Sequence, residues 1–127
     1  MMKEHGIQNA IRNALAGHCL AFRANVGQAW TGEPHRLPNG DLLLKNPRPF
    51  STGLPTGFSD LFGLVPVQVR PEHIGQVWAR FFALEVKSPT GRLRDQQEAF
   101  LRAVRQNGGL AGVARSEDDA RKIVLDS

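Results

Sequence analysis

The stretch Leu84-Glu85-Val86-Lys87, together with the earlier Gly57-Phe58-Ser59-Asp60, decides how this chain folds. Glu85 and Lys87 are two positions apart, so in an extended strand their side chains leave from the same face. That face offers a carboxylate oxygen for Mg²⁺ and an ammonium group that can offset the charge of a phosphate. Asp60 offers a second carboxylate to the same metal ion. The pattern therefore predicts the centre of a metal-dependent phosphodiesterase.

The residues around this pair predict regular structure in the second half of the chain. The apolar run Val77 to Val86 is typical of a central strand. A helix is expected to begin near Arg94 and to end at Asn107-Gly108-Gly109, and a short buried strand to follow from Leu110 to Ala114. The sequence Ser116-Glu117-Asp118-Asp119 indicates a capping box that opens a last helix.

The first half begins with a helix and a strand. Residues 18–25 favour a strand, and residues 60–69 favour another in which Pro66 indicates an edge or a break. Gly17 is a plausible stop for the preceding helix. The apolar positions of that helix follow the spacing i, i+3, i+4, i+7 and i+8: Ile7, Ala10, Ile11, Ala14 and Leu15.

Residues 27–57 have a different composition, with five prolines and five glycines. Pro38-Asn39-Gly40-Asp41 predicts a turn, and residues 41–45 a short strand after it. The rest is expected to be a long loop. Two interpretations are open: an elaboration over the active-site side, or a surface flap without a role.

The composition indicates one globular domain over residues 1–127. Hydrophobic content is 41% and charged content 22%, which argues against disorder. The formal net charge is +4, and only four of the 16 Lys and Arg residues are lysines, a bias that fits a nucleic-acid partner. Cys19 is the only cysteine, which excludes an intramolecular disulfide and a cysteine zinc cluster. The sequence has no membrane-span pattern and no signal-peptide core, so a reducing cytoplasm is expected.

Several short elements, taken in order, resemble the virus-type replication-repair nuclease domain (VRR-NUC), a branch of the restriction-endonuclease-like PD-(D/E)XK superfamily. The resemblance covers almost the whole chain apart from the 27–57 loop. Its elements are Glu4 before the first helix stripe, Gly57-Phe58-Ser59-Asp60, Glu85-Val86-Lys87, Gly91-Arg92-Leu93 with Gln97, Gly108-Gly109, and Ala114-Arg115-Ser116.

The resemblance implies an α/β fold with a restriction-endonuclease-like core. The expected order is α-β-β-β-α-β plus a C-terminal helix, with helices flanking a mixed central sheet. It implies a Mg²⁺- or Mn²⁺-dependent DNA endonuclease or exonuclease for flap or branched DNA in replication, repair or recombination. A homodimer of the stand-alone phage or prophage type is expected, in the cytoplasm of a bacterium or an infected host cell.

The residue roles that the chemistry predicts centre on the metal ion and the attacking water. Asp60 and Glu85 are the expected metal ligands, and the resemblance adds the backbone carbonyl of Val86. Lys87 is expected to position or help deprotonate the water and to offset developing charge. By resemblance, Gln97 orients the water or the lysine, although the adjacent Gln96 leaves an ambiguity.

Five further residues complete the prediction. Glu4 has two open interpretations: a ligand of a second metal ion, or an acidic residue that favours a helix N-terminus. Arg92 and Arg94 flank the expected site and are predicted to hold DNA phosphates. For Trp30 and Trp78, base stacking competes with a core or interface role.

An alternative function from another class is a catalytically silent DNA-binding accessory module that keeps the nuclease fold. The intact set of Asp60, Glu85, Lys87 and Gln97 argues against it. The four histidines show no metal-ligand spacing, and the serines lack a G-x-S-x-G context. No G-x-x-x-x-G-K-[ST] pattern is present, so nucleoside triphosphate binding is not supported.

Overall fold

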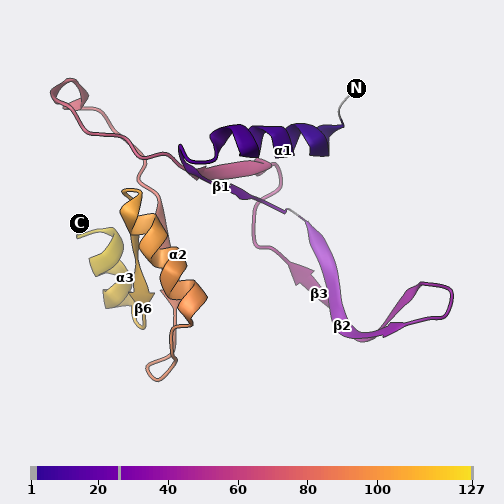
Figure 1. Cartoon of the computed structure of the whole chain (residues 1–127). Helices are drawn as coiled ribbons and strands as arrows, with labels where there is room; N and C mark the ends of the chain where they lie inside the picture. Colours follow the sequence, from indigo (N-terminus) through magenta and orange to yellow (C-terminus); the bar gives the residue numbers. More distant parts are fainter. Residues whose placement is uncertain (1–2, 26, 127) are drawn as a thin grey trace. The chain divides into compact units, whose positions relative to one another are not determined.

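The computed structural model describes residues 3–25 and 27–126 (Figure 1). The chain divides into two compact units, one formed by Phe22–Phe62 and the other by Met1–Ala21 with Gly63–Ser127. The single domain over residues 1–127 stays a prediction. The described residues hold three helices and six strands, and the strands form three two-stranded sheets. The mixed α/β class of a restriction-endonuclease-like fold is thereby confirmed.

Helix α1 spans Glu4–Leu15, as the apolar spacing predicts. Glu4 lies in the first turn and Arg12 in the last, the arrangement that the helix dipole favours. The helix ends before Gly17, whose φ of 85° is the left-handed conformation that commonly follows a helix. None of the described helices is long and apolar enough to cross a membrane.

Strands β1, Leu20–Arg23, and β4, Leu61–Leu64, form one two-stranded sheet. Both lie inside the ranges predicted as strands, 18–25 and 60–69. Strand β4 stops before Pro66, which confirms the predicted break, because proline has no N–H to donate to a ladder. The remaining residues, 65–69, are not part of a strand.

The expectation of a long loop over residues 27–57 is wrong. Strands β2, Gln28–Arg36, and β3, Leu42–Ser51, pair antiparallel and form a hairpin, which we call the ribbon. The loop interpretation relied on the prolines and glycines of this region. In a two-stranded ribbon each strand has a free edge, and prolines such as Pro34 and Pro49 are tolerated there.

The turn of the ribbon was predicted correctly at residues 38–41. The backbone N–H of Leu37 donates to the Asp41 carbonyl at 2.8 Å, and the N–H of Gly40 donates to the Leu37 carbonyl at 3.0 Å. The Asn39 side chain accepts from the Asp41 N–H at 3.0 Å, as turn asparagines often do. This local chemistry sets the register of the two strands.

The second half contains a strand–helix–strand unit built around a small core. Strand β5, Phe82–Val86, runs parallel to β6, Leu110–Ala114, and helix α2, Asp95–Gln106, connects them. Parallel strands need such a crossover. The buried apolar residues of the described chain lie here: Leu101, Val104 and Ala114. Strand β6 has its predicted bounds, whereas β5 begins at Phe82 and not at Val77.

Helix α3, Glu117–Val124, packs on β6, as does α2 (Figure 1). The Ser116 hydroxyl accepts from the backbone N–H of Asp119 at 3.1 Å, which confirms the predicted cap. Gly112 of β6 allows the close approach of α3, because a Cβ at this position would lie 2.7 Å from Cδ1 of Ile123. The cap and this glycine together fix α3 against the strand.

Candidate active site around Glu85

Glu85 and Lys87 lie together at the carboxyl end of β5. The Lys87 ammonium is 3.6 Å from Oε1 of Glu85, and the side chains are 16% and 31% exposed respectively. Lys87 follows the last residue of β5, and its backbone N–H donates to the Ala114 carbonyl at 3.1 Å. The ladder with β6 thus continues by one residue, and the period of two places both side chains on one face.

Gln97 joins this pair from the first turn of α2. Its Nε2 donates to Oε1 of Glu85 at 2.8 Å, and its Oε1 accepts from the backbone N–H of Arg94 at 3.0 Å. The second bond satisfies one of the free N–H groups at the helix start and fixes which way the amide faces. Gln97 is half-buried and Gln96 is exposed, so the structure favours Gln97 over its neighbour.

We call Glu85, Lys87 and Gln97 the acidic cluster, after the carboxylate at its centre. Both Lys87 and Gln97 contact the same oxygen, Oε1, of Glu85. Within the part of the chain that the structure describes, no hydrogen bond or ion pair occupies the other oxygen, Oε2. The carboxylate is therefore oriented by two neighbours while keeping one oxygen for a further partner.

Arg115 holds the segment that follows Lys87. Its Nη1 donates to the carbonyls of Ser88 and Gly91, at 2.5 and 2.7 Å. The backbone N–H of Arg115 donates in turn to Oδ2 of Asp119 at 2.9 Å. The turn after the acidic cluster is therefore tied to the start of α3. The sequence analysis named Arg115 only as part of a motif and did not predict this role.

Arg92 and Arg94 lie between the turn and the body of α2, and both are exposed. Neither forms an ion pair with an acidic residue in the described part of the chain. Arg94 is the residue that precedes the first helical position of α2. Both guanidinium groups are therefore open to an anion from solvent, and their role in DNA binding stays a prediction.

Asp60 belongs to the unit Phe22–Phe62. Its side chain is exposed, and its carbonyl accepts from the backbone N–H of Ala24 at 2.9 Å. The preceding Phe58 packs against Phe62, with ring centroids 5.4 Å apart. The Asp60 backbone is therefore held on both sides, at the point where β4 begins.

Glu4 lies in the first turn of α1 and is exposed. Within the described residues its side chain has no hydrogen bond or ion pair, so both interpretations of this residue remain open. Of the two interpretations of the tryptophans, base stacking and a packed role, the contacts of Trp78 favour the packed role. Its Nε1 donates to Gln76 at 2.7 Å, and its ring lies 4.5 Å from that of His73, whereas Trp30 is 65% exposed.

The donor set of the candidate site is one of hard oxygen atoms. At the end of β5, Glu85 carries a carboxylate and Val86 a backbone carbonyl, both of them groups that Mg²⁺ and Mn²⁺ accept, and Asp60 as a further ligand stays a prediction. No cluster of three or more His, Cys, Asp or Glu side chains forms among residues 3–25 and 27–126.

Comparison with known families gives one match. A sequence model of the family described as the VRR-NUC domain matches residues 43–118, which is more than half of the chain. The matched segment contains Asp60, the acidic cluster and Arg115, and it leaves out α1 with Glu4, β1 and β2. No curated protein and no solved structure gives a significant match.

Proposed function

The chain belongs to the VRR-NUC family of nucleases that act on DNA, and from this premise we propose that it hydrolyses phosphodiester bonds with Mg²⁺ or Mn²⁺. The observation that carries the proposal is the acidic cluster, where Lys87 and Gln97 both bind Oε1 of Glu85 and leave Oε2 for a metal ion. A half-buried lysine beside a strand-end carboxylate is costly unless both are used or paired.

The chain's own residues divide the chemistry between them. Asp60, Glu85 and the carbonyl of Val86 would hold the metal ion, which when bound would supply Lewis-acid stabilisation of charge on the phosphate. The Lys87 ammonium orients the attacking water and offsets negative charge as it develops. Gln97 keeps the Glu85 carboxylate in one orientation through the bond of 2.8 Å. Glu4 is a candidate for a second metal ligand.

DNA binding next to the site is assigned to Arg92 and Arg94. Both are exposed at the start of α2 and present guanidinium groups that match phosphate oxygens. Contacts to phosphates position a duplex without reading its sequence. We therefore propose that the substrates are DNA structures such as flaps or branched junctions in replication, repair or recombination.

A homodimer suits this substrate, because a two-fold axis would present two sites to a branched DNA. The proposal places the protein in the cytoplasm of a bacterium or a phage-infected cell, as a nuclease of the phage or prophage type. The dimer predicts a molecular mass of twice 14.0 kDa by light scattering. A monomer at every concentration would contradict it.

The test is cleavage of labelled linear, flap and four-way-junction DNA with Mg²⁺ or Mn²⁺ by the wild type and by Lys87→Ala. We expect metal-dependent cleavage that falls by roughly 10²- to 10³-fold in the variant, because one charged group at the reacting phosphate is lost. Lys122→Ala is the matched control, since Lys122 is an exposed lysine of α3 away from the acidic cluster.

Three outcomes are informative. Loss of DNA cleavage in Lys87→Ala, with cleavage kept in Lys122→Ala, supports the nuclease activity and the role assigned to Lys87. Equal activity in all three proteins contradicts the role of Lys87. Binding of DNA without cleavage by the wild type in either metal supports the catalytically silent accessory module instead.

A further inference from the structure

The two faces of the ribbon differ in charge and in exposure. Partners in the register share a face, so Thr31 with Arg48 and Glu33 with Lys45 lie on one side of the ribbon. Trp30 with Pro49 and Arg36 with Leu42 lie on the other side, because successive residues of a strand alternate. We call the side that carries Lys45, Arg48 and Phe50 the basic face.

A β-bulge keeps the two cations on that face. Between the partners Thr31–Arg48 and Glu33–Lys45, β2 has one residue, Gly32, and β3 has two, Asn46 and Pro47. Asn46 has a φ of 50°, the left-handed conformation that asparagine tolerates. A Cβ at position 32 would lie 2.9 Å from the Lys45 carbonyl, so only glycine fits there.

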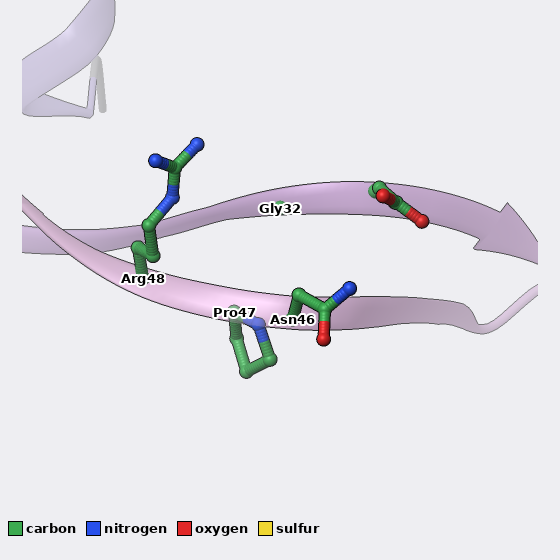
Figure 2. A pocket seen from close by; sticks show the side chains of 5 residues that line it. Gly32, Asn46, Pro47 and Arg48 are labelled. Carbon is green, nitrogen blue, oxygen red and sulfur yellow. The ribbon is translucent and has the colours of Figure 1, made fainter.

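The bulge adds one residue to β3 and so corrects the alternation between Lys45 and Arg48. Three positions separate these residues along the chain, which would place them on opposite faces of a regular strand. Figure 2 shows Arg48 and Pro47 extending from opposite sides of β3. The irregularity thus brings a second cation onto the basic face.

The basic face is the fully exposed side of the ribbon. Every residue assigned to it is exposed, and Phe50 is 52% exposed. The half-buried residues of the ribbon, Gly32 and Leu44, both lie on the opposite face. Solvent exposure of an aromatic ring beside two cations is a composition typical of nucleic-acid binding surfaces.

The cations of this face are available for an external anion. Within the described residues neither Lys45 nor Arg48 forms an ion pair or a side-chain hydrogen bond. Glu33 is the register partner of Lys45, and yet no ion pair joins them. The one acidic residue of the face therefore lowers its positive potential without neutralising a particular cation.

From these observations we infer that the basic face of the ribbon is a second DNA-binding surface, on which Lys45 and Arg48 hold backbone phosphates of a duplex. A two-stranded ribbon has the width that the major groove of B-DNA admits. The inference rests on the proposed function, because it takes DNA as the substrate. Lys45, Arg48 and Phe50 of β3 lie inside the segment that the family model matches, whereas β2 with Glu33 lies outside it.

The experiment measures the affinity of the full chain for a labelled linear duplex without added divalent metal, at about 50 and about 200 mM salt. The variants are Lys45→Gln with Arg48→Gln together, Arg48→Gln alone, and Glu33→Gln. Arg36→Gln is the matched control, because Arg36 is a ribbon arginine on the opposite face. Cleavage of the same DNA with Mg²⁺ is measured in parallel for every protein.

The double variant is expected to bind more weakly, and its disadvantage should be roughly tenfold larger at the lower salt concentration. This follows from a loss of about 0.9 in the salt slope for each phosphate contact. Glu33→Gln is expected to bind severalfold more tightly, a gain that a folding defect does not produce. Arg36→Gln should bind like the wild type.

A wild type that binds and cuts DNA, with the double variant unchanged in affinity and salt slope, would overturn the basic face and leave the proposed function standing. Equal weakening of DNA binding by Arg36→Gln and by Arg48→Gln would also overturn it, because affinity would then depend on the total charge of the ribbon and not on the face that carries it. A change of oligomeric state without a change of DNA affinity would assign the face to a second copy of the chain. If the wild type neither binds nor cuts DNA, the inference and the proposed function fail together.

Discussion

The acidic cluster and the basic face of the ribbon hold their charged groups in different ways. In the cluster, Glu85 is fixed by Lys87 and by Gln97, and these side chains are half-buried. On the ribbon, Lys45 and Arg48 are exposed and form no ion pair within the described part of the chain. Fixed geometry suits a reacting phosphate, whereas free, flexible cations suit phosphates that only need to be held.

The same contrast extends to the apolar residues beneath each region. Leu101 of α2 is 4% exposed, whereas Leu42 of β3 is 53% exposed. The cluster is thus supported by packed side chains, and the ribbon by its backbone pairing and its turn. Substitutions of the same chemical kind should therefore have unequal effects in the two regions.

The largest effect on stability is expected from Leu101→Ala. Removing this buried side chain leaves a cavity and should lower the free energy of unfolding by about 3 kcal/mol. The matched substitution Leu42→Ala should cost less than about 1 kcal/mol, because that side chain is already largely in water. Urea denaturation followed by circular dichroism measures both. Equal losses would show that the ribbon depends on side-chain packing as much as the core does.

A second prediction separates the two bonds of Gln97. Gln97→Leu loses both the bond to Arg94 and the bond to Glu85, so activity should fall roughly ten- to a hundredfold and stability by about 1 kcal/mol. Gln97→Glu keeps an acceptor for the Arg94 N–H and cannot donate to Glu85. Because it also places a second carboxylate beside Glu85, it should recover only part of the stability and none of the rate.

Gln96→Leu is the control for this pair, because Gln96 is the exposed neighbour. Single-turnover cleavage rates, titration with Mg²⁺ and thermal unfolding give the three readouts. A wild-type rate in Gln97→Glu would show that the contact with Glu85 has no part in the reaction, and that Gln97 serves only to begin α2.

Local patterns in the sequence predicted the core region well. The caps at Asn107-Gly108-Gly109 and Ser116, and the apolar run of β6, are signals carried by neighbouring residues. The ribbon was missed because prolines and glycines are strong turn indicators, and their tolerance at free strand edges depends on a pairing that the local sequence does not show. Its turn at residues 38–41 was predicted, since a turn depends on adjacent residues.

The candidate site also combines features that neighbouring residues predict with features that depend on contacts between distant segments. The proximity of Glu85 and Lys87 comes from the period of a strand. The family resemblance predicted that Gln97 orients the water or the lysine, and its contact with Glu85 was not predicted. The contacts of Arg115 with Ser88 and Gly91 span 27 and 24 positions. They arise only when β6 pairs with β5, so no local pattern indicates them.

The smallest effect concerns a serine in each region that accepts a backbone hydrogen bond. Ser116 accepts from the Asp119 N–H at 3.1 Å and opens α3, whereas Ser51 accepts from the Gly53 N–H at 3.3 Å at the end of β3. Ser116→Ala leaves a helix N–H without its cap and should cost about 1 kcal/mol. Ser51→Ala exposes an N–H that water can satisfy, so it should cost no more than about 0.5 kcal/mol. Chemical denaturation resolves this difference in the free energy of unfolding. A larger loss of stability in Ser51→Ala than in Ser116→Ala would contradict the prediction, because the end of the ribbon would then depend on its hydroxyl more than α3 does.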